Sequence, residues 1–461
     1  MPGFRKVLVA NRGEIAVRVI RACRELGIRT VAIASRADQG APHTELADEV
    51  HDVGGPKIAD SYLNLPRILE VARQAGAEAI HPGYGMFAEN AAAARQIGDA
   101  GLVFIGPPAE VIALMGDKVA ARRAAQEAGV PVAQGSEPLR DADMIRRVAG
   151  HLGYPVIVKP VAGGGGIGMA IVLDEAALDK TLAAAQRLAQ HSFGNAEVYI
   201  ERYVPQARHI EVQLLADHHG AVIHMGERDC TVQRRYQKLI EETPSSALTP
   251  PRREAIIGAA VRLAEAVGYR SAGTMEFLVA PDGAFYFMEM NTRIQVEHPV
   301  TEMVTGLDIV REQIRIAAGE RLAFRQEDVR PRGHAIECRV YAEDYTRNFL
   351  PSVGTISRMT VPEGTGVRVD SGVRSGSPVS MYYDPLLCKV VAWDQDRSAA
   401  VLRMRRALAE LQIEGVKTTR DLHLRVLEAP EFLDGRLHTR ILEEEWLPRF
   451  LEQVKREEMT R

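Results

Sequence analysis

The sequence predicts a mixed α/β protein that begins with a parallel βαβ domain and continues into α+β structure. Strand and helix patterns alternate over the first hundred residues, which is typical of βαβ units. An Asp-Gly pair at residues 282–283 joins two runs of apolar and aromatic residues, a strong hairpin signal. After Gly333 the pattern changes to short strands with Gly and Pro turns. With 461 residues, 46% of them hydrophobic, the chain is expected to form about two to four domains.

The composition and the cysteines favour a cytoplasmic protein. The net charge of −4 gives no reason to expect nucleic acid or an anionic membrane as partner. No run approaches the ~18 apolar residues of a membrane span, and the N-terminus leads into a strand pattern without a signal peptide. Cys23, Cys230, Cys338 and Cys388 lie far apart and form no metal-spaced pair. They are expected to be buried or site-adjacent thiols in a reducing compartment.

The N-terminal unit is predicted from two strands and the helix between them. Residues 7–10 and 30–34 are apolar runs typical of buried strands, and residues 15–26 have helical periodicity. The turn at residues 11–13 lacks the full Gly-x-Gly-x-x-Gly spacing, so no dinucleotide site is predicted. The His-Pro-Gly-Tyr-Gly segment at residues 81–85 follows another strand, where open α/β sheets bind ligands. A purely structural turn remains the alternative there.

A lysine and a glycine run together indicate phosphate binding in the middle of the chain. Lys159 ends a predicted strand, and residues 163–166 are four consecutive glycines before the next strand at residues 169–173. Glycines allow the backbone to approach a phosphate closely, although a flexible tip is the alternative. No Gly-Lys-Ser/Thr follows, so this is not a P-loop. Lys118, at the start of a predicted helix, is either a surface charge or a second phosphate ligand.

The predicted hairpin at residues 274–291 brings two carboxylates together. If Asp282-Gly283 is a two-residue turn, Glu276 lies directly opposite Glu289 on one sheet face. Facing carboxylates repel unless a cation lies between them, and carboxylates with substrate phosphates are the usual ligands of magnesium. Two solvated glutamates are the alternative, and a three-residue loop would shift the register by one. The same register pairs Leu278 with Phe287 and Thr274 with Asn291.

The segment after the hairpin carries the groups needed to bind and deprotonate a small oxyanion. If the segment is extended, Arg293, Gln295 and Glu297 project to one side. A guanidinium suits a planar oxyanion, an amide adds a directional bond, and a carboxylate takes a proton. Ile294 and Val296 project to the other side.

The rest of the chain is predicted to alternate strands and helices. Residues 208–215 alternate strictly, so Ile210, Val212 and Leu214 face the core while His209, Glu211 and Gln213 face the other way. His209 is either a structural sheet histidine or a ligand. Helical patterns occupy residues 252–268, 302–318 and 398–411, and residues 335–341 form a strand with Arg339 on its polar face.

Together these stretches resemble the biotin carboxylases of the ATP-grasp superfamily over nearly the whole chain. The most specific part is Glu-Met-Asn-Thr-Arg-Ile-Gln-Val-Glu-His-Pro at residues 289–299. Residues 10–16, 81–85, 115–118, 227–230 and 337–339 support the resemblance. The sequence departs from the usual family pattern at Ile167, at Tyr236 and at residues 86–88. Ile167 replaces a basic residue, and Tyr236 replaces a histidine near the nucleotide ribose.

The resemblance implies an ATP-grasp fold and a separate subunit of a biotin-dependent carboxylase, such as acetyl-CoA carboxylase. The implied domains are residues 1–115, an ATP-grasp domain at residues 116–325 with a mobile lid at about 133–204, and a C-terminal domain at residues 333–445. No Met-Lys-Met biotin attachment site occurs. The biotin carboxyl carrier protein and the carboxyltransferase are therefore expected on separate chains, and a homodimer is expected for this one.

The resemblance also implies a ligase reaction in which ATP, bicarbonate and carrier-attached biotin give carboxybiotin, ADP and phosphate through carboxyphosphate. About two Mg²⁺ or Mn²⁺ ions would assist. The implied metal ligands are Glu276, Glu289 and Asn291, and the implied bicarbonate ligands are Lys238, Arg293, Gln295 and Val296. The implied catalytic residues are Glu297 as base, Arg339 beside the biotin enolate, Arg293 and Lys238. The implied ATP-binding residues are Lys118, Lys159, Gly164, Gly165, Gly166, Met169, Glu201, His209, Gln233 and Leu278.

Two other functions are compatible with parts of this pattern. An ATP-grasp enzyme that joins a carboxylate to an amine would share Lys118, Lys159 and the paired glutamates, without needing Arg293, Gln295, Glu297 or Arg339. A silent nucleotide-binding chain would bind ATP without turnover. The sequence leaves the final acyl acceptor open among acetyl-CoA, propionyl-CoA, pyruvate and others.

Overall fold

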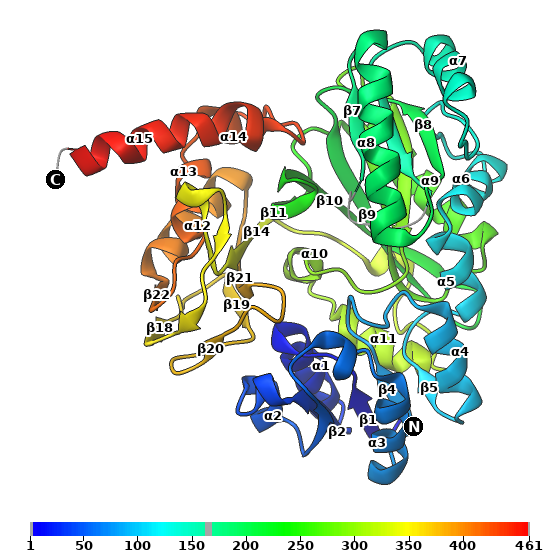
Figure 1. Cartoon of the computed structure of the whole chain (residues 1–461). Helices are drawn as coiled ribbons and strands as arrows, with labels where there is room; N and C mark the ends of the chain where they lie inside the picture. Colours follow the sequence, from blue (N-terminus) through cyan, green and yellow to red (C-terminus); the bar gives the residue numbers. More distant parts are fainter. Residues whose placement is uncertain (1–2, 162–167, 460–461) are drawn as a thin grey trace.

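Three larger β-sheets carry the architecture in the computed structural model, which describes residues 3–161 and 168–459. Figure 1 shows the N-terminal sheet and its helices below, a small three-stranded sheet at the upper right, and the C-terminal part at the left, around long central strands. The mixed α/β fold predicted from the sequence is confirmed.

The N-terminal sheet is parallel, as the βαβ pattern predicted. Its strand order is β3-β2-β1-β4-β5, and each neighbouring pair is parallel. The strands are β1 Lys6–Val9, β2 Arg29–Ser35, β3 Glu49–Gly54, β4 Ala79–His81 and β5 Val103–Phe104. The helices are α1 Gly13–Glu25, α2 Pro42–Leu46, α3 Leu65–Ala75, α4 Ala91–Asp99 and α5 Ala109–Gly116. The apolar residues of β1, β2 and β4 are buried, which places the core of this part on both faces of the sheet.

The central sheet has eight antiparallel strands in the order β13-β12-β9-β10-β11-β14-β21-β19. Its strands are β9 Arg208–Ala216, β10 Val222–Arg234, β11 Gln237–Thr243, β12 Ser271–Val279, β13 Phe285–Asn291, β14 His334–Tyr341, β19 Val367–Ser371 and β21 Leu386–Asp394. The pairing of β11 with β14 carries the sheet across the boundary expected near residue 333. The middle and C-terminal parts therefore share one continuous hydrogen-bonded ladder.

A second, smaller antiparallel sheet forms the segment expected to be a lid. Its strands are β6 Val156–Pro160, β7 Ala170–Val172 and β8 Val198–Arg202, in the order β7-β6-β8. Helices α7 Ala142–Leu152 and α8 Glu175–Phe193 pack on it and enclose an apolar core of their own. The predicted phosphate-contacting glycines Gly164, Gly165 and Gly166, and Ile167, lie outside the described residues.

Helices cover both faces of the central sheet. One face packs against α9 Pro250–Ala266, α5 and α6 Lys118–Glu127.

The single helix predicted at residues 302–318 is wrong, because two helices occur there: α10 His298–Thr305 and α11 Ile309–Ala317. Gly306 ends α10 in the left-handed conformation (φ 72°), and Asp308 caps α11 by accepting a hydrogen bond from the Arg311 N–H.

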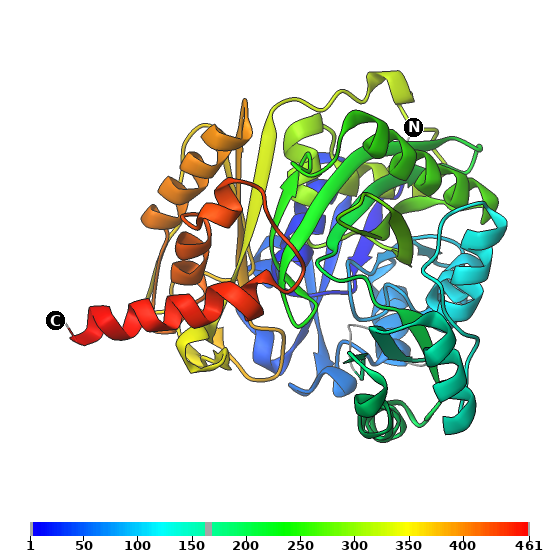
Figure 2. The same cartoon turned by 90° about the horizontal axis from the view of Figure 1, so that it is seen from above.

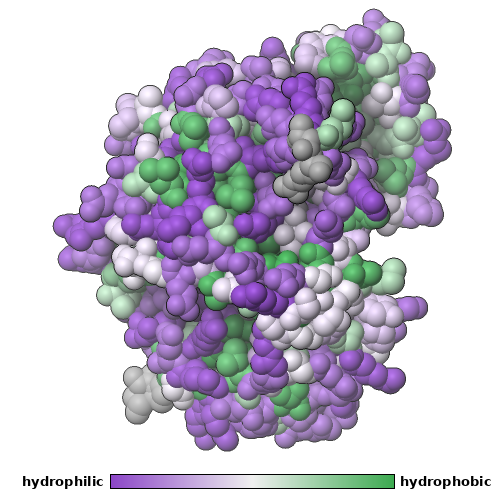
Figure 3. All heavy atoms as spheres, turned by 90° about the vertical axis from the view of Figure 1, so that its left-hand side faces the viewer, coloured by the Kyte–Doolittle hydropathy of each residue, from purple (hydrophilic) through white to green (hydrophobic). Residues whose placement is uncertain are grey.

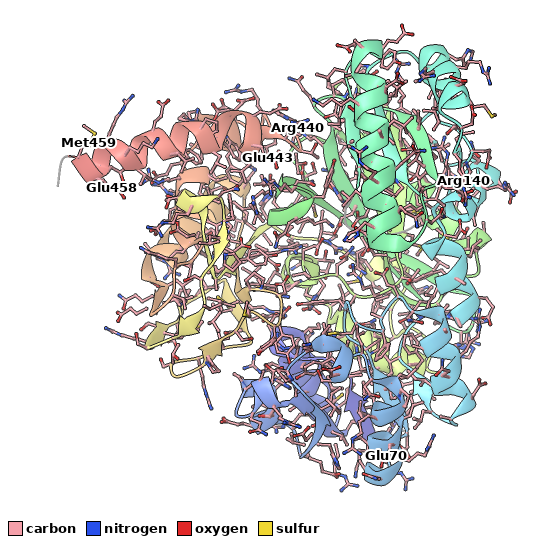
Figure 4. The ribbon with its side chains drawn as sticks, viewed as in Figure 1. Glu70, Arg140, Arg440, Glu443, Glu458 and Met459 are labelled. Carbon is pink, nitrogen blue, oxygen red and sulfur yellow. The ribbon has the colours of Figure 1, made fainter. Side chains whose placement is uncertain are left out.

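The C-terminal part packs helices on the outer strands of the central sheet. The helices are α12 Arg397–Glu410, α13 Arg420–Val426, α14 Pro430–Leu433 and α15 Leu447–Met459, with a π-helical turn at Leu442–Trp446. Short pairs join β15 Glu343–Asp344 to β16 Leu350–Pro351, β17 Gly354–Thr355 to β20 Pro378–Val379, and β18 Arg358–Thr360 to β22 Gln412–Glu414. Single 3₁₀ turns occupy Arg36–Asp38, Ile58–Asp60, Gln326–Asp328 and Tyr345–Arg347. Figures 1 and 2 show α15 projecting from the body, and Figure 4 labels Glu458 and Met459 at its far end.

The surface is largely polar on the face shown in Figure 3, where apolar residues are scattered. Across residues 3–161 and 168–459, no helix has both the length and the apolar character needed to cross a bilayer.

Gly372 is where the C-terminal part touches the start of the N-terminal helix. A Cβ atom at Gly372 would lie 2.6 Å from the Glu14 nitrogen and 2.8 Å from the Gly13 Cα. We expect Gly372→Ala to lower the free energy of unfolding by about 1–3 kcal/mol, because backbone atoms have to move apart. Urea unfolding of the parent and the variant measures the change.

The matched control is Gly98→Ala. Gly98 lies in α4 without a positive φ, and a Cβ atom there would meet no described atom within 4 Å beyond the backbone of its own helix. Alanine there should be neutral or stabilise by up to ~1 kcal/mol. Equal unfolding midpoints for the two variants would contradict the tight contact at Gly372.

Candidate active site

The hairpin of β12 and β13 brings together the two glutamates that the sequence predicted to face each other. Glu276 pairs with Glu289, and Thr274 pairs with Asn291. The predicted pairing of Leu278 with Phe287 is wrong, because Leu278 pairs with Tyr286. The Ala280 N–H donates to the Ala284 carbonyl, which makes the loop three residues long rather than two. A β-bulge beyond Phe287 then restores the register at the glutamates.

Lys238, at the start of β11, joins three buried carboxylates. Its Nζ lies 2.5 Å from Glu211 Oε2, 2.8 Å from Glu276 Oε1 and 2.6 Å from Glu297 Oε1. Burial would lower the pKa of Lys238, but the three carboxylates raise it well above its usual value. The lysine is therefore a fixed cation in the middle of the site.

Glu297 is held as a carboxylate by the cations around it. Arg339 donates from Nη2 to Glu297 Oε2 over 2.9 Å and from Nε to Glu241 Oε1 over 2.6 Å. Burial alone would raise the pKa of Glu297, but Lys238, Arg339 and Arg228 lower it well below the usual range. The side chain of Glu297 has no exposed surface. A buried, ionised carboxylate between two cations is a group that can accept a proton from an anion bound beside it.

The segment after the hairpin folds Arg293 and Gln295 toward the same place. Arg293 donates from Nη1 to Gln295 Oε1 over 2.8 Å and from Nη2 to Asn291 Oδ1 over 2.9 Å. Gln295 in turn donates from Nε2 to Glu276 Oε1 over 3.1 Å. Arg293 and Gln295 thus converge near Glu276, and Glu297 reaches the same carboxylate through Lys238, while Ile294 packs into an apolar core. The guanidinium and the amide are placed to bind a small oxyanion next to Glu297.

Glu289 has the electrostatic character expected of a metal ligand. Burial raises the pKa of Glu289, and the nearby Glu276 and Glu89 raise it further. Within the described residues Glu289 makes no side-chain hydrogen bond that would relieve this repulsion, whereas Glu276 accepts from Lys238 and Asn291. A divalent cation beside Glu276, Glu289 and Asn291 would relieve it with oxygen ligands.

A second set of ligand-type atoms lies nearby. His209, Glu211 and Glu276 present nitrogen and oxygen atoms within 4.8 Å of one another. Glu211 is already paired with Arg228 over 2.5 Å and with Lys238. The Glu276–Glu289 pair is the better candidate, because no cation of the described part of the chain is bonded to Glu289.

The predicted nucleotide side lies between the central sheet and the three-stranded sheet. Lys159, at the end of β6, and Arg122 of α6 both pair with Glu201 of β8. Burial would lower the pKa of Lys159, and Glu201 and Tyr199 raise it well above its usual value. Lys118 lies close enough to Glu289 and Lys159 for their charges to act on its pKa, which burial lowers. The two lysines therefore lie on the same side as the paired glutamates.

The remaining predicted nucleotide residues lie at several points around this space. Leu278 and His209 are neighbours on adjacent strands, and His209 Nε2 lies 3.0 Å from Glu276 Oε2. Gln233 is buried and donates to the Cys230 carbonyl over 3.3 Å. Met169 is half-buried directly before β7. His209 thus contacts the charged cluster through Glu276, and its role as a nucleotide ligand stays a prediction.

Several residues of the site have no individual signal in the sequence. Glu211 and Gln213 lie on the polar side of β9, and the structure buries that side completely. The only signal was their strict alternation with apolar residues. This alternation predicts that they share one side of the strand, but it does not predict which residues pack over that side. Glu89 accepts hydrogen bonds from Arg293 Nε and the Thr292 N–H across more than 200 residues. Only the fold brings that pair together.

Comparison with known families agrees with these observations in three successive parts of the chain. Residues 3–112 match the family model described as biotin carboxylase, N-terminal domain. Residues 117–325 match the carbamoyl-phosphate synthase L chain, ATP binding domain, and residues 337–444 match the biotin carboxylase C-terminal domain.

Curated proteins and solved structures match over nearly the full length. A biotin carboxylase of Nostoc sp. is 52% identical, covering 96% of this chain and 99% of that protein. A pyruvate carboxylase subunit of Methanothermobacter thermautotrophicus is 51% identical, covering 96% and 90%. The biotin carboxylase domain dimer of Hydrogenobacter thermophilus 2-oxoglutarate carboxylase, solved with MgADP, ADP and bicarbonate, is 50% identical with a TM-score of 0.93, covering 96% and 98%. The Campylobacter jejuni biotin carboxylase–β-γ-ATP complex is 44% identical with a TM-score of 0.94, covering 96% and 99%.

Proposed function

The chain belongs to the biotin carboxylase family of ATP-dependent ligases, and we propose that it carboxylates biotin on a separate carrier chain. ATP and bicarbonate are the cosubstrates, and carboxyphosphate is the intermediate. The observation that carries the proposal is the convergence of Glu297, Arg293 and Gln295 beside the paired Glu276 and Glu289. A carboxylate–amine ligase would not need that oxyanion pocket.

Deprotonation of bicarbonate is the first role assigned to this pocket. Arg293, Gln295, Lys238 and the backbone of Val296 bind the anion, and the ionised Glu297 takes its proton. The deprotonated anion then attacks the γ-phosphoryl group of ATP, which forms carboxyphosphate and releases ADP, and a positioned base contributes ~10²–10⁴-fold to such a step. Arg339 already contacts Glu297, so it is placed to stabilise negative charge on the ureido oxygen of biotin.

ATP is placed by the lysines and carboxylates on the nucleotide side. Lys118 and Lys159 supply positive charge for the phosphates, and Glu201, His209, Gln233, Leu278 and Met169 contribute to the rest of the nucleotide site. Gly164, Gly165 and Gly166, which are also expected to contact ATP, lie outside the described residues. Magnesium or manganese ions, held by Glu276, Glu289 and Asn291, would neutralise the transferring phosphoryl group. The three-stranded sheet has its own core, which supports a role as a lid that moves as a unit over ATP.

The assembly is proposed from the same family membership. The Hydrogenobacter domain is described as a dimer, which supports a homodimer for this chain. The biotin carboxyl carrier protein and the carboxyltransferase are then separate chains. Four buried free cysteines support a reducing cytoplasmic location. The relatives include chains of pyruvate and 2-oxoglutarate carboxylases, which supports a choice of acyl acceptor that is made by the partner chains.

Bicarbonate-dependent ATP hydrolysis tests the proposed function. The purified chain should release ADP only when bicarbonate is present, and free biotin should increase the rate. A carboxylate–amine ligase would instead turn over ATP without any bicarbonate requirement. A silent nucleotide-binding chain would bind MgADP without releasing ADP from ATP under any of these conditions.

A further inference from the structure

A second buried charge cluster lies directly behind the segment that carries Glu297. Its centre is Lys389 of β21, whose side chain has no exposed surface. Lys389 Nζ donates to the Val296 carbonyl over 2.6 Å and lies 3.2 Å from Glu14 Oε1 and 3.9 Å from Asp370 Oδ2. Three parts of the fold, namely α1, β19 and β21, therefore meet at one ammonium group.

We propose that Lys389 is a positioning residue for bicarbonate deprotonation, because it fixes the peptide carbonyl between Gln295 and Glu297. This inference rests on the proposed function, in which those two side chains bind and deprotonate bicarbonate. Lys389 itself lies behind the segment and touches none of the proposed substrates.

The hydrogen-bond geometry supports a role beyond neutralising Glu14. The shortest contact of Lys389 is the one to the Val296 carbonyl, and both ion pairs are longer. The preceding carbonyl, that of Gln295, is also held, since His298 Nδ1 lies 2.8 Å from it. Burial and the positive charge of Lys389 keep the pKa of His298 well below its usual value, so the neutral ring donates from Nδ1. Two consecutive carbonyls of the segment are thus anchored from behind.

The position of the Val296 carbonyl affects the site because Gln295 and Glu297 are its neighbours in the chain. Glu297 has to lie between Lys238 and Arg339 while Gln295 reaches Glu276, and both side chains leave the backbone beside the anchored Val296 carbonyl. Without the ammonium, this carbonyl would be buried next to Glu14 and would be repelled by it. A displacement of about 1 Å of a catalytic group costs ~10²-fold in rate.

The test compares a charge-balanced variant with a control in the same cluster. Lys389→Met alone leaves Glu14 buried without its cation and is expected to destabilise the fold. Lys389→Met combined with Glu14→Gln removes both charges, and the new amide still accepts the Tyr84 hydroxyl hydrogen bond now made to Glu14. Asp370→Asn removes a negative charge near Lys389 but leaves the contact with the Val296 carbonyl in place.

We expect the double variant to regain much of the parental melting temperature without regaining activity. The KM for bicarbonate should rise about 10-fold and kcat/KM for bicarbonate should fall ~10²-fold. The affinity for MgADP, measured by calorimetry, should stay within about 3-fold of the parent, because the nucleotide side is not touched. Asp370→Asn should keep the parental KM for bicarbonate even where its melting temperature falls.

A double variant with parental KM and kcat would overturn the inference, since stability alone would then account for Lys389. An equal rise in the bicarbonate KM of Asp370→Asn would also overturn it, and this comparison decides the matter if neither Lys389 variant folds. Absence of bicarbonate-dependent turnover in the parent would instead reject the proposed function itself.

Discussion

Glu297→Gln is expected to lower bicarbonate-dependent ATP turnover by at least ~10²-fold, with an upper range near 10⁴-fold. The amide has nearly the same shape as the carboxylate, but it accepts no proton. One of its two ends would also present N–H groups to Lys238 or Arg339, which both donate to Glu297 in the parent. ADP release, measured with and without bicarbonate, gives the change, and calorimetry with MgADP should give parental affinity.

The control is Glu312→Gln. Glu312 is also a buried glutamate with an arginine partner, since Arg315 donates to it over 3.2 Å, but it lies in α11 outside the site. Its turnover should remain within about 2-fold of the parent, because changes away from a site have small effects. Parental turnover of Glu297→Gln would remove Glu297 as the base.

Lys238→Met is expected to have the largest effect on stability. Three buried carboxylates lose their common cation, and removing one partner of a buried ion pair costs about 3–5 kcal/mol. Glu211 retains Arg228 and Glu297 retains Arg339, so the loss should stay within that range. Urea unfolding at pH 7 measures it, and bicarbonate-dependent turnover should be abolished as well.

The pH dependence of this loss separates it from a simple packing defect. Despite burial, Lys238 helps to lower the pKa values of Glu276 and Glu297, so their stabilisation is present above the unfolded pKa of about 4.3. Without Lys238 the carboxyl groups protonate more readily, so the difference in unfolding free energy between parent and variant should shrink as the pH falls from 7 toward 5. A difference independent of pH would contradict the electrostatic explanation.

Lys6→Met is the matched control for this variant. Lys6 is also buried and pairs with a single carboxylate, Glu49, over 2.6 Å. The Glu49 side chain is about one-third exposed and can be rehydrated, so a smaller loss is expected. Bicarbonate-dependent turnover should remain, because Lys6 lies at the start of β1, outside the site.

The predicted pairing of Glu276 with Glu289 occurs in the structure because two deviations from the predicted hairpin cancel each other. The Asp-Gly signal indicated a two-residue turn, but Ala280 and Ala284 close a three-residue loop. That loop shifts the pairing by one residue, and the β-bulge before Glu289 shifts it back. Local turn statistics do not include such a bulge, because it depends on how both strands pack within the whole sheet.

Contacts between segments that are far apart in the chain could not be predicted from the sequence, because no local pattern relates the two partners. Periodicity identified the strand that carries Arg339 and the hairpin that precedes Glu297, and the family resemblance identified Lys238, Glu297 and Arg339 themselves. The partners Glu89 of Arg293 and Lys389 of the Val296 carbonyl have no spacing that relates them to the site. Likewise, the alternation in β9 indicated that one side of the strand is polar. It did not indicate that this side is buried, because its burial depends on how the loop at residues 292–297 and α10 pack against the sheet.

The ladder between β11 and β14 affects which fragments of the chain can be stable alone. A fragment ending at residue 325 would lack β14, so the outer backbone groups of Ile240, Glu241, Glu242 and Thr243 would have no partner. Leu239 and Ile240, now in the apolar core that the C-terminal part completes, would be exposed to water beside that open edge. Unpaired strand edges next to apolar side chains promote aggregation, so the ATP-binding part is not expected to be soluble without its C-terminal neighbour.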